Sequence, residues 1–229
     1  MRKLYTALLS FTVLLATSCV PGESPIRILG FFSVDTGMGG AECMLTNDVG
    51  QTRGRLDASG GGDYVVVMQV ASDVTSQPVL QNARGLDLTG PGSRNFVATE
   101  IFLTYRSVNP SITFDAETIP IVATIAPATS DNRIAADIIG DKAATKLRDM
   151  LSDPTITTIL TVNVQLRGRL ESGETIHSNT LSFPIEVTPS NAPCPEPGNV
   201  ARTGPCGARG GQDGTPVICC TGPGMPAGC

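Results

Sequence analysis

The chain has 229 residues, of which 41% are hydrophobic and 16% charged, and a formal net charge of −5 at pH 7. That length is enough for one sizeable core, or for one core and an appendage. The acidic balance lacks the basic footprint of a nucleic-acid-binding protein. The absence of Trp and an aromatic content of 4% argue against a surface that stacks sugars or bases.

The first residues have the pattern of an export signal. Arg2 and Lys3 precede an apolar run from Leu4 to Ala16, and the small residues Thr17 and Ser18 follow it. The run is too short to cross a bilayer, for which a helix needs about 20 residues. A basic start, a short apolar stretch and small residues before a cleavage site are typical of a secretory signal peptide.

Cysteine stands directly after this stretch, and the sequence Ala16-Thr17-Ser18-Cys19 resembles the lipobox of bacterial lipoproteins. The resemblance implies that residues 1–18 are removed and that Cys19 is acylated on its thiol and its new amino group. Two acyl chains already hold a protein stably on a membrane. The membrane would then be a partner through Cys19, and the location the bacterial cell envelope. The alternatives are an uncleaved anchor and a plain secreted protein.

Two features of residues 19–25 predict where the folded part lies relative to the membranes. Residues 19–25 form a tether that reaches at most about 20 Å, so we expect the folded part to lie close to the membrane. Val20 follows the cysteine, which resembles the outer-membrane sorting pattern of lipoproteins from bacteria with two membranes.

Residues 26–188 are predicted to form one all-β domain. Frequent Gly and Pro separate short runs that are rich in β-branched residues. Strands are expected over residues 26–34, 64–70, 97–105, 112–114, 119–125 and 134–138. Residues 64–70 are apolar at nearly every position, which indicates burial on both faces. Val97, Ile101, Leu103 and Tyr105 are expected to share one face, and the Gly-rich stretch from Gly37 to Gly62 to be an irregular loop.

One helix is predicted between these strands. Asp141 occupies the N-cap position, and Asp153-Pro154 ends the helix. Apolar residues recur with helical spacing along one stripe: Ala143, Leu147, Met150 and Leu151.

A β-hairpin is predicted after the helix. Apolar residues alternate with polar ones on both strands: Leu160, Val162, Val164 and Leu166, then Leu181, Phe183, Ile185 and Val187. Ser172-Gly173 marks the turn. Ile176 is out of phase with the return strand, which predicts a bulge near Asn179. Pro184 marks an edge strand or a bulge.

Seven or eight strands predict an immunoglobulin-like two-sheet β-sandwich with one short inserted helix. The Cys…Trp…Cys signature of immunoglobulin domains is absent, because the chain contains no Trp. The expected similarity is therefore to an architecture and not to a family.

The remaining cysteines predict a disulfide-stapled tail. They are Cys43, Cys194, Cys206, Cys219, Cys220 and Cys229. Export places them in an oxidising compartment, where an even number indicates disulfides. Five of them lie in the Gly/Pro-rich segment 189–229, which cannot build a core of its own. We expect Cys43 to pair with one tail cysteine, and Cys219 and Cys220 to have different partners. Six cysteines allow 15 pairings, so the connectivity stays open.

The sequence contains few residues in patterns typical of a catalytic or metal-binding site. His177 is the single histidine, and no Gly-x-Ser-x-Gly motif supplies a nucleophile. Cys-x-x-Cys pairs are absent, which disfavours zinc. Glu171 and Glu174 are interpreted as solvated charges at the hairpin tip. We expect no catalytic residue, cofactor or metal site.

The candidate functional surface is a polar row on the long hairpin strand. Asn163, Gln165, Arg167 and Arg169 would share one face, which could grip an anionic glycan or the carboxylates of a partner. The alternative is the solvated face of an edge-lying hairpin. The sequence therefore favours a non-enzymatic binding or structural role. The other hypotheses are an enzyme with an unrecognised site and a surface adhesin that acts through the Cys-rich tail.

Overall fold

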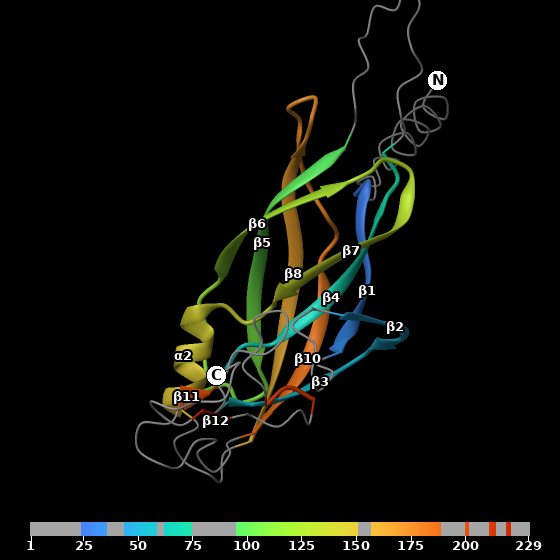
Figure 1. The fold of residues 1–229 in the computed structure, drawn as a ribbon. Helices are drawn as coiled ribbons and strands as arrows, with labels where there is room; N and C mark the ends of the chain where they lie inside the picture. Colours follow the sequence, from blue (N-terminus) through green and yellow to red (C-terminus); the bar gives the residue numbers. More distant parts are fainter. Residues whose placement is uncertain are drawn as a thin grey trace, which may run out of the picture.

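The computed structural model describes residues 24–35, 44–58, 62–74, 95–150, 157–188, 200–201, 211–213 and 219–220. Within these residues the protein is mostly β, with one helix and two main sheets (Figure 1). This confirms the all-β prediction. The predictions for Cys19, Cys43, Cys194, Cys206 and Cys229 lie outside the described residues, as do those for Leu151 and for the helix end at Asp153-Pro154.

A four-stranded sheet has the order β2-β1-β4-β7. Its strands are β1 (Ile26–Asp35), β2 (Met44–Gln51), β4 (Val65–Ser72) and β7 (Thr129–Asp137), and all neighbours are antiparallel. In β4 every residue except Gln69 is buried, so the expected burial on both faces is confirmed.

A six-stranded sheet has the order β3-β10-β8-β5-β6, with β9 also paired to β8. Its strands are β3 (Gly54–Asp57), β5 (Phe96–Ser107), β6 (Glu117–Ile125), β8 (Thr158–Leu170), β9 (Thr175–His177) and β10 (Leu181–Thr188). A separate short pair joins β11 (Val200–Ala201) to β12 (Cys219–Cys220).

One hydrophobic core is shared by the two main sheets. The rings of Phe31 from β1 and Phe183 from β10 meet edge to face, with centroids 5.0 Å apart. Tyr64 packs on the same Phe183 ring at 5.7 Å. Aromatic contacts of this kind add about 0.5–1.5 kcal/mol to the burial of area, and this group connects one sheet to the other.

The predicted hairpin is confirmed. Leu160, Val162, Val164 and Leu166 of β8 are each 0% exposed, and Gly173 takes φ +93° in the turn. Arg167 pairs with His177 of β9, whereas Val164 pairs with Leu181 of β10. The return strand therefore has one more residue than β8 between these pairs, which is the bulge expected near Asn179.

The position of β8 corrects the idea of an edge-lying hairpin, because β5 and β10 flank this strand on both sides. β10, the strand that contains Pro184, is an edge strand over only part of its length. β3 pairs with Ile185–Thr188 of β10 and stops before Pro184, so the proline lies where β10 needs no donor toward β3.

The prediction of which β5 residues face the core is wrong at the start of the strand. Phe96 and Ala98 are 0% exposed, as are Ile101 and Leu103, whereas Val97 is only partly buried. The register with β6 shifts between Ala98 and Glu100. A bulge at this point reverses the inward face, and such a shift leaves no simple signal in the periodicity.

Two further strand predictions are wrong. The stretch expected to be a loop contains β2 and β3. β2 is an edge strand with few apolar residues, and β3 buries Leu56 through its parallel pairing with β10 and through contact with Gln212. Residues 112–114 form no strand: Ile112 is buried in a loop, and Phe114 packs on the Tyr105 ring at 5.8 Å.

Helix α2 (Asp141–Met150) buries Ala143, Ala144 and Leu147 against the core. Its N-terminus is not capped as predicted, because Asp141 already lies within the helix and the Gly140 carbonyl accepts from the Ala144 amide. The Glu117 carboxylate of β6 instead accepts from the amides of Lys142 (3.0 Å) and Ala143 (2.9 Å). A carboxylate at this end also complements the helix dipole.

Replacing Glu117 by Ala should lower the free energy of unfolding by about 1–2 kcal/mol, because two helix amides lose a charged acceptor. Urea unfolding measures the change. Thr118→Ala, at the exposed neighbouring position of β6, is the control and should change stability by less than about 0.5 kcal/mol. Equal unfolding midpoints for the two variants would contradict the assigned cap.

Candidate binding face

The four predicted polar residues of β8 do lie on one face, the side of the six-stranded sheet that is turned away from the core. Asn163, Gln165 and Arg167 are partly buried and Arg169 is exposed, and they alternate with buried apolar residues. We call this surface the outer face. Cross-strand neighbours on it include Thr104 and Phe102 of β5, His177 and Thr175 of β9, and Ser182 of β10.

The two amides of this row are engaged by the protein itself. Asn163 accepts a hydrogen bond from the Ser182 hydroxyl (2.7 Å) and donates one to Thr104 Oγ1 (3.2 Å). Gln165 donates from Nε2 to the Ser178 carbonyl (3.2 Å) and accepts at Oε1 from Arg167 Nε (3.2 Å). Their structural partners leave little capacity for a ligand.

Arg167 is held in one orientation. Its guanidinium carbon lies 3.5 Å from the centre of the Phe102 ring, while Gln165 accepts from its Nε. Stacking on a ring and a fixed Nε are the conditions under which the planar fork of Arg is preorganised for a carboxylate. Among the described residues, no hydrogen bond or ion pair involves its terminal nitrogens.

Arg169 lies beside a shallow depression of about 290 Å³ at the hairpin end of the same face, lined also by Val97, Leu170, Glu171 and Gly173. Glu171 accepts a hydrogen bond from Asn95 Nδ2 (3.2 Å). Glu174 and His177 are exposed nearby. Arg167 and Arg169 occupy alternate positions on the same side of β8, so their backbones are about 7 Å apart along the strand.

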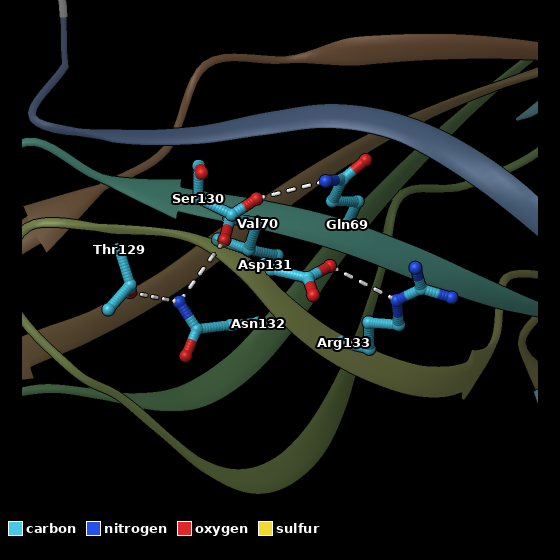
Figure 2. Close-up of polar contacts among 7 residues, drawn as sticks. All are labelled: Gln69, Val70, Thr129, Ser130, Asp131, Asn132 and Arg133. Carbon is cyan, nitrogen blue, oxygen red and sulfur yellow. Dashed lines mark hydrogen bonds and ion pairs between the residues drawn. The ribbon is translucent and has the colours of Figure 1, made fainter. Parts of the chain in front are cut away.

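An arginine of the four-stranded sheet has an environment that can be compared with that of Arg167. Arg133 of β7 also lies over an aromatic ring, 5.3 Å from the centre of Phe32. Its Nε, however, donates to the Asp131 carboxylate at 3.3 Å (Figure 2). In both arginines, Nε donates to the side chain of the residue two positions earlier on the strand. Asp131 neutralises Arg133, whereas the neutral Gln165 leaves the charge of Arg167 available.

Sequence reasoning missed Phe102, which orients Arg167 from a different strand. The available signal was an aromatic residue at a position of β5 that alternates with the buried Ile101 and Leu103. Its pairing with Arg167 depends on the register of β5 against β8, which the sequence alone does not supply.

Sequence reasoning also missed how the C-terminal region contacts the domain. Gly211–Asp213 lie along β3: the Asp57 amide donates to the Gly211 carbonyl (2.8 Å) and the Asp213 amide to the Arg55 carbonyl (2.8 Å). The Asp213 carboxylate accepts from the Arg55 amide (2.9 Å) and the Tyr64 hydroxyl (2.7 Å). These contacts need no disulfide. Cys219 and Cys220 pair through their backbones with Ala201 and Val200.

In the described part of the chain, no group of three or more His, Cys, Asp or Glu side chains is arranged to hold a metal ion. The helix found in those ranges is too short and too polar to cross a membrane.

The described residues form a mostly β protein whose six-stranded sheet carries two arginines on its outer face. No protein-family model and no curated protein matches the chain.

Proposed function

We propose that the chain is a lipid-anchored lipoprotein of the bacterial envelope, of the outer membrane where the source has one, and a non-enzymatic module that binds an anionic partner through the outer face. The observation that carries the binding role is Arg167, which is stacked on Phe102 and fixed by Gln165 with its terminal nitrogens directed to no described partner. The formal net charge of the chain is −5. Arg167 and Arg169 therefore give this acidic protein two cationic side chains on one strand, with Glu100 of β5 opposite Arg167.

The tether supports an orientation for this module. The Ser24 hydroxyl donates to the His177 carbonyl, so the start of β1 lies beside the hairpin (Figure 1). If Cys19 carries the acyl chains, the hairpin end and Arg169 face the membrane and α2 lies at the distal end. Cys19→Ala should move the protein from the membrane to the soluble fraction of cells. Unchanged membrane recovery would overturn the anchor.

The binding role is tested by capture of neighbours with a crosslinker in the native envelope. Arg167→Ala should reduce capture of its main partner by about tenfold or more, because one charge-assisted contact is worth about 1.5–3 kcal/mol. Arg106→Ala is the matched control: this exposed arginine lies opposite Thr161 on the same sheet, about 20 Å away along the strands. Equal capture by the two variants would overturn the proposed face.

We also propose that the two sheets form an immunoglobulin-like sandwich and that disulfides staple segment 189–229. The shared core and the position of α2 between β7 and β8 support the first point, and export supports the second. Intact-mass analysis should show a chain that begins at Cys19, with three acyl chains and about six hydrogens fewer than the reduced form. A fully reduced mass would overturn the staples.

The adhesin hypothesis needs a finer test than removal of the tail. Deleting residues 189–229 also removes Gln212 and Asp213, which bond to β4 and β3, so loss of capture would reflect the fold as well. Substitutions confined to residues 221–228 that abolish capture would favour the adhesin.

A further inference from the structure

We infer that the ligand of the outer face is an acidic peptide segment in extended conformation, whose alternate carboxylates pair with Arg167 and Arg169. This inference rests on the proposed binding function and names the class of partner. It follows from the donors that remain free, from their spacing, and from the charges on either side of β8.

The free donors favour carboxylates over sugar hydroxyls. A sugar is held by side chains that both donate and accept, and commonly by an aromatic ring under its flat face. Here the amides of Asn163 and Gln165 already have protein partners, and the guanidinium of Arg167 covers the Phe102 ring. What remains is cationic and donor-only, which is the complement of a carboxylate.

The spacing favours an extended chain. Arg167 and Arg169 are separated by two residues of one strand, which is about 6.8 Å. An extended peptide repeats its side chains on one side with the same period. Acidic residues at positions i and i+2 of the peptide would therefore meet both guanidiniums without distortion of either partner.

The flanking charges select the path of the peptide. Glu100 of β5 stands opposite Arg167, and no ion pair joins these two among the described residues. Its carboxylate repels an acidic ligand from the β5 side. On the other side, His177 and Thr175 of β9 stand opposite Arg167 and Arg169. The peptide is therefore expected to lie over β8 and β9 and to end before Glu171 and Glu174 at the hairpin turn, where two further carboxylates are exposed.

The Arg133 arrangement suggests a variant that tests charge without removing the arginine. Gln165→Glu would give Arg167 the same kind of neighbour that Asp131 gives Arg133, an internal carboxylate at Nε. Arg167 would keep its stacking on Phe102 but would pair with the new carboxylate, and the hydrogen bond from Gln165 Nε2 to the Ser178 carbonyl would be lost. The matched control is Thr161→Glu, which adds the same charge on the same face of β8, six residues from Arg167 and opposite Arg106.

The test is calorimetric titration of the full-length protein in detergent with a peptide of alternating Glu and Thr. A peptide of alternating Gln and Thr and the uronate polymer polygalacturonate are the comparison ligands. The Glu-Thr peptide should bind, and Arg167→Ala and Gln165→Glu should each weaken binding by about 10- to 100-fold. Thr161→Glu should change it less than about threefold. Circular dichroism confirms that each variant is folded.

Three outcomes would overturn the inference. Binding of polygalacturonate but not of the Glu-Thr peptide would make the ligand an anionic glycan. Peptide binding that ignores both Arg167→Ala and Gln165→Glu would place it elsewhere. Absence of peptide binding, with envelope crosslinking still dependent on Arg167, would refute the peptide and keep the proposed function; crosslinking independent of Arg167 would refute the proposed function as well.

Discussion

Replacing Gln212 by Ala is expected to lower the free energy of unfolding by about 3 kcal/mol. Gln212 lies far along the chain from the sheets, yet its side chain is buried and only 5% exposed. Its Oε1 accepts from the Val65 amide (2.9 Å) and its Nε2 donates to the Val65 carbonyl (2.6 Å). The substitution leaves both backbone groups unpaired, and each such buried group costs about 1–3 kcal/mol.

Urea unfolding at neutral pH measures this loss. The matched control is Gln69→Ala on β4, where the amide donates to the Ser130 carbonyl at 2.9 Å in an exposed position (Figure 2). That substitution should cost about 0.5 kcal/mol or less. If Gln212→Ala proved as mild as Gln69→Ala, the docking of Gly211–Asp213 would not hold in solution.

The docking of Gly211–Asp213 gives the C-terminal region a contact with the domain that is independent of cysteine chemistry. Asp213 has φ +49°, a conformation that Asp tolerates better than most residues. Tyr64 is 0% exposed, and burial together with the Asp213 carboxylate raises the pKa of its hydroxyl. The proton therefore stays on Tyr64 and the hydroxyl remains a donor to Asp213.

The elements that the sequence predicted well are those whose signals are local. The alternation in β8, the apolar run of β4 and the turn at Gly173 each follow from the residues within them. β3 could not be predicted, because its four residues acquire partners from β10 and from Gln212, far away in the chain. The same holds for Glu117, which caps α2 from another strand.

The polar row of β8 was predictable as a face but not as a site. Alternation places Asn163, Gln165, Arg167 and Arg169 together whatever the sheet order. The four residues have two different roles in the structure. Asn163 bonds to a neighbouring strand and Gln165 to Arg167, whereas the two arginines carry the positive charge that is available to a ligand. This division depends on the register with β5 and β9, which sets Phe102 and His177 beside them.

Asp137→Asn is expected to stabilise the protein at pH 8 and to have little effect at pH 4. Asp137 is partly buried at the end of β7, where its Oδ1 accepts from the amides of Tyr64 (3.0 Å) and Ile139 (2.9 Å). Burial raises the pKa of its carboxyl from 3.8 to about 6, and Asp63 and Asp141 add to the rise while the two amides oppose it.

The direction of this pH dependence follows from the linkage between the ionisation of Asp137 and folding. The folded protein ionises Asp137 less readily than the unfolded chain, so the ionised carboxylate disfavours folding. This penalty is absent below about pH 4, grows between about pH 4 and 6, and is complete above the folded pKa of about 6. A rise of the Asp137 pKa from 3.8 to about 6 corresponds to at most about 3 kcal/mol. Asparagine keeps the Oδ1 acceptor without the charge, so it removes the penalty.

Urea unfolding of both proteins from pH 4 to pH 8 measures the difference in free energy. Its value should rise through this window and then level off. Asp115→Asn, which removes the same charge from an exposed position, is the control variant. A curve for Asp137→Asn that is parallel to the parent curve throughout would show that Asp137 ionises as freely in the folded protein as in the unfolded chain, and the burial argument for this end of β7 would then be wrong.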